Sequence, residues 1–261
     1  MEKVKAKKHL GQHFLRDENI ARKIVQALLD RNEDGPVLEV GPGMGVLTKY
    51  LLDARTEDVY VAEIDRESVA YLSEHYPALV PRILQEDFLT IRFNRFSSPL
   101  AVIGNFPYNI SSQIVFHIIE QKESVPLMVG MFQREVAQRL AAIPRTKAYG
   151  ILSVITQAFY DVEYLFTVSE GVFQPPPKVK SAVVRLTRKN NVLNCDEKLF
   201  LRVVKAAFNQ RRKMLRNALS GFGNLDVLMN TPFLTQRAEE LTLQQFEQLT
   251  LLLQNRRDAT G

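Results

Sequence analysis

Gly35-Pro-Val-Leu-Glu-Val-Gly41-Pro-Gly-Met-Gly45 is the stretch that decides the fold of this chain. Its first part is typical of a buried strand, and the glycines that follow at alternate positions predict a tight turn. A helical pattern begins directly afterwards at Val46, and Asp58–Ile64 predicts a second strand. A strand, a glycine turn, a helix and another strand form the repeating unit of a parallel α/β sheet.

The same alternation continues through two thirds of the chain. Further strands are predicted at about 82–84, 99–104, 125–132, 162–167 and 182–187, and helices at 66–76, 110–119, 133–142 and 150–159. The last two strands are expected to form a hairpin with a long loop. These elements predict an α/β protein with a doubly wound, mostly parallel, seven-stranded Rossmann-like sheet.

A polar stretch at 188–194 suits a domain boundary, so we expect domains at 1–187 and 188–261. Beyond the boundary, helical patterns at about 196–219, 224–230, 234–239 and 242–256 predict a small all-helical domain.

Composition limits the classes of protein to which the chain can belong. It has 261 residues with one cysteine and four histidines, which excludes an internal disulfide and a cysteine-rich zinc site. No apolar run approaches the roughly 20 residues of a membrane-spanning helix, and the charged N-terminus lacks a signal sequence. We therefore expect a cytoplasmic protein that binds neither metal nor membrane. We also expect it to act as a monomer.

The net charge of +5 comes from the C-terminal part of the chain. Residues 1–187 contain 22 basic and 22 acidic side chains, whereas residues 188–261 contain 12 basic and 7 acidic ones. Such an excess indicates a polyanionic partner, although a solvated helix face is the alternative. The predicted RNA-binding residues are Arg202, Lys205, Arg211, Arg212, Lys213 and Arg216.

The fourth predicted strand ends in a turn that suits a flat base with an exocyclic amine. The side-chain oxygen of Asn105 and the backbone carbonyl of Phe106 can both accept hydrogen bonds from such an amine. Two acceptors direct the nitrogen lone pair at an electrophile. Pro107 stiffens the turn, and Tyr108 offers a ring face for stacking. We predict that these four residues are catalytic, the alternative being an ordinary strand-to-helix turn.

Acidic residues at the ends of three successive strands indicate the cofactor. Glu63 stands 22 residues after Gly41, a usual place for a carboxylate that binds ribose hydroxyls. Asp87 can accept a hydrogen bond from an adenine amine, and Ile64 or Phe88 can pack on the adenine ring.

Glu39 lies before the glycine turn, where a carboxylate disfavours a pyrophosphate and suits a cationic amino group. The spacing Gly41-x-Gly43-x-Gly45 also differs from the pattern of dinucleotide enzymes. The cofactor predicted by these residues is therefore S-adenosylmethionine rather than a nicotinamide. Its sulfonium methyl is already activated, so an oriented amine needs no catalytic base, and the target base must be flipped or single-stranded.

Four motifs occur in order along the chain, namely Leu10-Gly-Gln-x-Phe-Leu15, Glu39-Val-Gly-Pro-Gly-x-Gly45, Asn105-x-Pro-Tyr-Asn-Ile-Ser111 and Phe173-x-Pro-x-Pro-Lys-Val-x-Ser181. With these motifs the chain resembles the small-subunit ribosomal RNA adenine dimethyltransferases. The resemblance implies a class I methyltransferase that dimethylates N6 of two adjacent adenines in a hairpin loop near the 3′ end of 16S RNA. It thereby implies a role in small-subunit biogenesis.

The resemblance also implies particular contacts. The cofactor contacts are position 13, Leu15, Gly41, Glu63, Asp87 and Asn105, and Tyr108 and Phe173 stack on the target base. The family usually has Asn where this chain has His13, whose ring nitrogen can still donate a hydrogen bond to the cofactor.

Three alternatives remain open at this point. One is the related family that methylates an adenine of 23S RNA and confers macrolide resistance. A second is a non-catalytic RNA- or DNA-binding factor on the same scaffold. A third is a nicotinamide dehydrogenase, which nothing after residue 100 supports.

Overall fold

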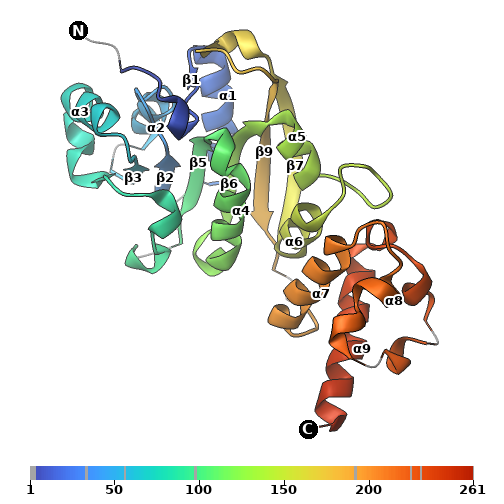
Figure 1. Ribbon diagram of the computed structural model, residues 1–261. Coiled ribbons are helices and arrows are strands. Elements are labelled where there is room, and N and C mark those ends of the chain that lie inside the picture. Colours follow the sequence, from blue (N-terminus) through green and yellow to red (C-terminus); the bar gives the residue numbers. More distant parts are fainter. Residues whose placement is uncertain are drawn as a thin grey trace. The chain divides into compact units, whose positions relative to one another are not determined.

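The computed structural model describes residues 4–32, 35–55, 57–96, 99–190, 193–223, 225–229 and 231–260 (Figure 1). The chain divides into two compact units, 1–137 with 161–188 and 138–160 with 189–261. The division after Arg188 lies next to the boundary expected from the sequence. Residues 138–160 differ from that expectation, because they belong to the second unit rather than the first.

The first unit is built on a seven-stranded sheet with the order β4-β3-β2-β5-β6-β9-β7 (Figure 1). Strands β4, β3, β2, β5 and β6 are mutually parallel, and β9 runs antiparallel to β6. The strands are β2 (Val37–Val40), β3 (Val59–Ala62), β4 (Ile83–Leu84), β5 (Ala101–Asn105), β6 (Leu127–Gln133), β7 (Tyr160–Val168) and β9 (Ser181–Arg188). The predicted mostly parallel sheet is confirmed, and its last two strands are neighbours as expected.

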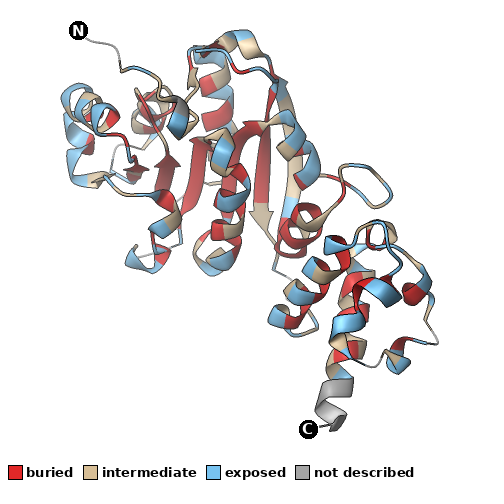
Figure 2. Cartoon of the chain, in the orientation of Figure 1, coloured by how far each residue is buried: buried red, intermediate tan, exposed pale blue. Residues whose placement is uncertain are grey.

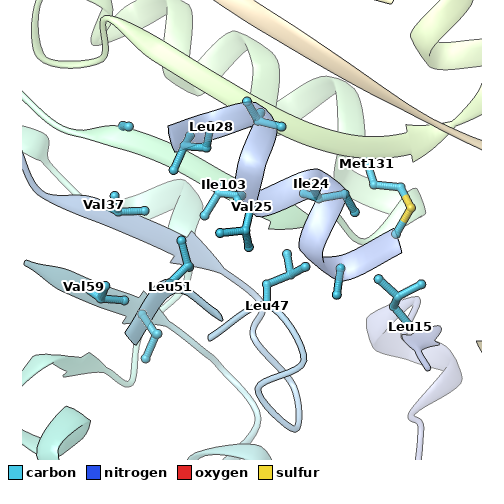
Figure 3. Packing of buried hydrophobic residues seen from close by; sticks show 14 of the residues in the cluster. Leu15, Ile24, Val25, Leu28, Val37, Leu47, Leu51, Val59, Ile103 and Met131 are labelled. Atoms are coloured by element: carbon cyan, nitrogen blue, oxygen red, sulfur yellow. The ribbon is translucent and has the colours of Figure 1, made fainter. Parts of the chain in front are cut away.

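Both faces of the sheet are covered, so its central strands are buried throughout (Figure 2). Ala101 and Ile103 of β5 point into the core formed with α1 and α2, whereas the intervening Val102 belongs to the opposite face. Figure 3 shows this core, with Ile24 of α1 and Leu51 of α2 packed over the strands. Burial on both faces explains why the strands are continuous apolar runs rather than alternating ones.

The helices that follow the strands are set by local signals. They are α1 (Glu18–Leu29), α2 (Thr48–Ala54), α3 (Arg66–His75), α4 (Ser111–Glu120) and α5 (Arg134–Leu140). Asp17 caps α1 by accepting hydrogen bonds from the backbone N–H groups of Asn19 and Ile20, at 2.9 and 3.0 Å. Helices α2 to α5 agree with the predicted ones to within a few residues.

The sequence did not predict a second, two-stranded sheet that crosses the loop of the β7–β9 hairpin. Strand β1 (Phe14–Leu15) pairs antiparallel with β8 (Phe173–Gln174), so that Leu15 lies opposite Phe173. Both of these side chains are in the hydrophobic core. The pairing therefore fixes the N-terminal segment beside the loop that precedes β9.

The second unit is helical and contains α6 (Ile151–Phe159), α7 (Glu197–Asn209), α8 (Leu215–Ala218) and α9 (Leu243–Thr260). Helix α6 contacts both α7 and α9, which explains why residues 138–160 belong here. The ring of Tyr149 packs edge-to-face on Phe208, and its hydroxyl donates a 2.8 Å hydrogen bond to the carbonyl of Leu241.

The continuous helix predicted over 196–219 is wrong, because α7 ends at Asn209 and α8 begins at Leu215. Met214 forms a β-bridge with Arg237 at this break, which takes its backbone out of the helix. The helices predicted at 224–230 and 234–239 are replaced by 3₁₀ turns at Asp226–Leu228, Pro232–Thr235 and Ala238–Glu240. Asn224 and Asn230 lie outside the described residues.

Two paired glycines make room for the ring of Phe106. Gly104 of β5 lies opposite Gly130 of β6, and the Phe106 side chain is only 1% exposed. A Cβ atom on Gly130 would stand 2.2 Å from a carbon of this ring, and one on Gly104 would stand 2.6 Å from the carbonyl oxygen of Val40. The sheet thus holds Phe106 where its backbone begins the turn after β5.

Gly130→Ala is expected to destabilise the protein by about 1–3 kcal/mol, because the added methyl group overpacks the site under Phe106. Urea unfolding measures this change. Gly171→Ala is the matched control, since its Cβ would meet no atom within 4 Å. Equal stability of the two variants would contradict the packing described here.

Candidate active site

A cavity lies at the carboxyl ends of β2, β3 and β5, the edge at which open α/β sheets bind ligands. The predicted site residues that line it are His13, Gly41, Gly43, Glu63, Ile64, Asp87, Phe88, Asn105, Phe106, Pro107 and Tyr108. The predicted site residues that do not line it are Leu15, Glu39, Gly45 and Phe173.

The glycines of the turn after β2 have different roles. Gly41, Gly43 and Gly45 all have positive φ angles, of 65°, 57° and 80°, which favour glycine. A Cβ on Gly41 would meet no atom within 4 Å, so this position leaves open space at the cavity. A Cβ on Gly45 would stand 2.7 Å from the ring of Tyr76. Gly45 therefore serves helix packing, not the ligand contact expected from the sequence.

Glu63 joins the ends of β2 and β3 at the cavity wall. Its carboxylate accepts hydrogen bonds from the backbone N–H groups of Gly43 at 3.2 Å and Asp65 at 2.9 Å. Burial raises the pKa of Glu63, and these two N–H donors act against that rise. The carboxylate is thus held in one orientation with an edge on the cavity.

The far wall of the cavity combines one acid with two apolar side chains. Asp87 begins a 3₁₀ turn and accepts a 2.9 Å hydrogen bond from the N–H of Leu89. Phe88 is buried and packs edge-to-face on His117. Ile64 is 53% exposed, although it is a large apolar residue at the cavity wall. A flat ligand ring would cover such a surface.

The side chain of Asn105 is oriented by the N-terminal segment. Its Nδ2 donates a 2.8 Å hydrogen bond to the backbone carbonyl of His13. Only the amide nitrogen can donate to a carbonyl, so this bond fixes which way the Asn105 amide faces. The Oδ1 atom then remains as the acceptor that Asn105 presents at the cavity.

Tyr108 is held by contacts on two sides. Its hydroxyl lies 2.5 Å from the hydroxyl of Ser181, and its ring centroid lies 5.2 Å from that of His13. Burial raises the pKa of Tyr108, against the effect of the Ser181 hydrogen bond. At the start of α4, the hydroxyl of Ser111 donates back to the carbonyls of Pro107 and Tyr108 and makes no capping hydrogen bond.

Residues 7–14 form a strap over the cavity, which we call the N-terminal strap. Lys7 anchors its start through ion pairs with Asp65 at 2.5 Å and Glu67 at 3.0 Å. The ring of His13 anchors its end by a 2.9 Å hydrogen bond to the carbonyl of Pro175. Sequence reasoning missed Lys7, Asp65 and Ser181, because their partners are distant in the chain and no spacing signals them.

The side chains of Leu15 and Phe173 lie in the core, which contradicts the base stacking implied for Phe173, whereas the cofactor contact implied at Leu15 stays a prediction. They are 4% and 2% exposed and pack in the core, so Phe173 cannot stack on a base in this conformation. The reason is the alternation of side chains along a strand. Phe14 points to the cavity, and its neighbour Leu15 therefore points to the core.

Glu39 was expected to hold a cationic amino group, and the structure contradicts a direct contact. Its side chain is 1% exposed beneath the glycine turn and accepts a 2.6 Å hydrogen bond from the hydroxyl of Thr48. Burial raises the pKa of Glu39 to about 8, against the effect of the Thr48 hydrogen bond. Glu39 therefore links β2 to the start of α2 instead of contacting the ligand.

The predicted RNA-binding residues of the second unit fall into two groups. Arg211 is half-buried and binds inward, to the Glu239 carboxylate at 2.6 Å and to the carbonyls of Thr146 and Lys147 at 3.3 and 3.0 Å. The exposed residues are Arg202, Lys205, Arg212, Lys213 and Arg216. In the described part of the chain, none of these five forms an ion pair with an acidic side chain.

Two further searches covered the described residues. None of the helices there combines the length and apolar character needed to cross a membrane. No group of three or more His, Cys, Asp or Glu side chains there is arranged to hold a metal ion.

The strand order, the antiparallel β9 and the cavity at the carboxyl ends of β2, β3 and β5 define a class I methyltransferase. Solved structures agree with this class. A dimethyladenosine transferase from Plasmodium falciparum matches with a TM-score of 0.80 and 25% identity, over 94% of this chain and 98% of that one. The 23S rRNA methyltransferase ErmE matches with a TM-score of 0.70 and 28% identity, over 92% and 99%.

Sequence comparison narrows the class to a family. The family model described as ribosomal RNA adenine dimethylase matches residues 3–254. The chain is 53% identical over 255 residues to a ribosomal RNA small subunit methyltransferase A of Cytophaga hutchinsonii, with 97% of this chain and 99% of the relative covered. It is 56% identical over 253 residues to the protein of that name from Flavobacterium johnsoniae, with 96% of each covered. The chain belongs to the ribosomal RNA adenine dimethylase family.

Glu39→Gln is expected to flatten the dependence of stability on pH between 4.5 and 8. The pKa of Glu39 is about 8 in the folded protein against an ordinary value of 4.5. Folding therefore keeps a proton that the unfolded chain releases, and this contribution to stability is lost as the pH rises through that window. Gln cannot ionise and can still accept the Thr48 hydrogen bond.

The measurement is the melting temperature of both proteins at a series of pH values. The wild type should lose more stability than Glu39→Gln as the pH rises. The Glu63 charge contributes to the raised pKa of Glu39, so the difference between the two curves reports Glu39 together with its coupling to Glu63. Parallel curves would show that Glu39 is already ionised in the folded protein.

Proposed function

We propose that the protein transfers methyl groups from S-adenosylmethionine to N6 of two adjacent adenines in a hairpin loop near the 3′ end of 16S RNA. The product would be two N6,N6-dimethyladenosines, made during small-subunit biogenesis. The observation that carries the proposal is the hydrogen bond from Asn105 to the His13 carbonyl, which leaves an acceptor at the cavity. The family and the small-subunit names of the relatives support the RNA and the subunit.

The cavity fits S-adenosylmethionine at several positions. Gly41 leaves room for close approach to the backbone, and the fixed Glu63 carboxylate suits the ribose hydroxyls. Asp87 suits the adenine amine, with Phe88 and Ile64 as the apolar surface for the ring. When bound, the cofactor would supply a methyl group on a positively charged sulfur. The neutral thioether that remains after the transfer is a good leaving group.

The turn after β5 prepares the target amine. Asn105 Oδ1 and the Phe106 carbonyl accept its two N–H groups, which localises the nitrogen lone pair and orients it for in-line attack. Tyr108 packs on the base, and its hydrogen bond to Ser181 holds the ring in place. The amine becomes acidic as its new N–C bond forms, so water can remove its proton and no catalytic base is needed.

The base must leave its RNA stack to reach this turn. The exposed cations of the second unit, Arg202, Lys205, Arg212, Lys213 and Arg216, are proposed to bind phosphates of the same RNA. We further propose that the enzyme acts as a monomer in the cytoplasm, which sedimentation and cell fractionation test.

The likeness to ErmE favours one alternative, the methylation of an adenine of 23S RNA. Mapping methylated adenines in ribosomal RNA from cells with and without the protein separates the two substrates. The proposal expects two adjacent dimethyladenosines in 16S RNA that disappear with the gene. Methylation that disappears from 23S RNA alone would overturn the proposed substrate.

Asn105→Ala is expected to lower the methylation rate by at least about a hundredfold, because a positioned acceptor for the reacting amine is lost. RNA affinity should fall by no more than about tenfold, because one hydrogen bond to the target amine is lost. Methyl incorporation into small-subunit RNA and a parallel binding titration measure the two effects. Asn94→Ala, at an exposed position, is the control. An active Asn105→Ala variant would remove Asn105 from the mechanism.

Replacing Arg212, Lys213 and Arg216 together by Gln is expected to weaken RNA binding and to reduce its dependence on salt. The slope of log K against log[salt] should fall by roughly 2–3, because about that many phosphate contacts are lost. Arg211→Gln should instead destabilise the second unit, since Arg211 binds Glu239 and two backbone carbonyls. An unchanged slope in the triple variant would place the RNA on another surface.

A further inference from the structure

The first unit carries a cluster of cations that the predicted RNA-binding set did not include. Arg134 begins α5, and Lys178 and Lys180 lie in the segment before β9. All three side chains are exposed, and none forms an ion pair in the described part of the chain. We call Arg134, Lys178 and Lys180 the β9 cation cluster.

The sheet fixes this cluster beside the catalytic turn. In the β6–β9 ladder Gln133 lies opposite Ser181, and the N–H of Arg134 donates a 2.9 Å hydrogen bond to the carbonyl of Lys180. Ser181 in turn lies 2.5 Å from the hydroxyl of Tyr108. Lys180 therefore directly precedes the residue whose hydroxyl contacts Tyr108. The backbone of Arg134 is hydrogen-bonded to the backbone of Lys180.

In the described part of the chain, the β9 cation cluster has no acidic partner to neutralise it. Glu170 is the acidic side chain whose charge reaches the Tyr108 hydroxyl, and Glu135 beside the cluster has an interaction of its own. Three positive charges on two hydrogen-bonded segments create a local positive potential, which the phosphates of a nucleic acid would lower.

A nucleotide whose base is flipped out of the RNA stack supplies such phosphates, namely the ones on either side of it. When a base enters the pocket, the phosphates on either side of its ribose stay outside, close to the residues that hold the base. We propose that the β9 cation cluster binds the phosphodiester backbone that flanks the target adenosine. This inference rests on the proposed function and gives the catalytic unit an RNA contact of its own, distinct from the cations of the second unit.

The test is a full-length variant with Arg134→Gln, Lys178→Gln and Lys180→Gln. The probe is the 16S 3′ hairpin RNA, titrated at several salt concentrations with S-adenosylhomocysteine bound. RNA affinity should fall by roughly tenfold or more, and the salt slope by roughly 2, because phosphate contacts are lost. In turnover assays KM for RNA should rise more than kcat falls.

Two controls separate charge from structure. Affinity for S-adenosylhomocysteine, measured by calorimetry, should not change, since none of the three residues lines the cofactor cavity. The matched variant Lys23→Gln, Arg31→Gln, Arg92→Gln removes three exposed cations of the same unit and should keep the wild-type salt slope. Lys178→Arg with Lys180→Arg should also keep it, because the positive charges remain.

The outcomes separate this inference from the proposed function. If the wild type methylates the hairpin and the triple variant binds it with unchanged affinity and slope, the inference is overturned and the proposed function stands. If the wild type binds the hairpin without methylating it, the proposed function fails. The comparison of salt slopes then still decides whether the β9 cation cluster contacts RNA.

Discussion

One hydrogen bond, from the Asn105 amide nitrogen to the His13 carbonyl, determines what the catalytic turn can do. An amide side chain can present either its oxygen or its nitrogen, and only the oxygen accepts from an amine. The His13 carbonyl decides between them, and it belongs to a segment 92 residues away in the chain. The chemistry of the turn therefore depends on how the N-terminal strap is held.

The strap in turn connects the two halves of the site. Lys7 ties its start to Asp65, whose backbone N–H holds the Glu63 carboxylate at the proposed ribose position. The β1–β8 pairing ties its end to the loop before β9, where Ser181 holds Tyr108. The parts that would grip the cofactor and the target base are thus joined through one short stretch of backbone.

The sequence predicted what is local and missed what depends on side-chain direction. The strand-to-turn positions of Glu63, Asp87 and Asn105 follow from periodicity, because parallel strands end at one edge of a sheet. Phe173 was misplaced because a motif does not say which face of a strand each residue takes. Arg211 was misjudged because its partners, Glu239 and the loop at 146–147, are distant in the chain.

The most direct test of the account is a double-mutant cycle between Asn105 and the target amine. Hairpin RNAs with adenine or with unsubstituted purine at the target position are titrated against the wild type and Asn105→Ala, with S-adenosylhomocysteine bound. The account predicts a coupling free energy of about 1 kcal/mol or more, because the Asn105 oxygen binds that amine. A coupling of zero would show that Asn105 does not contact the amine and would contradict the account.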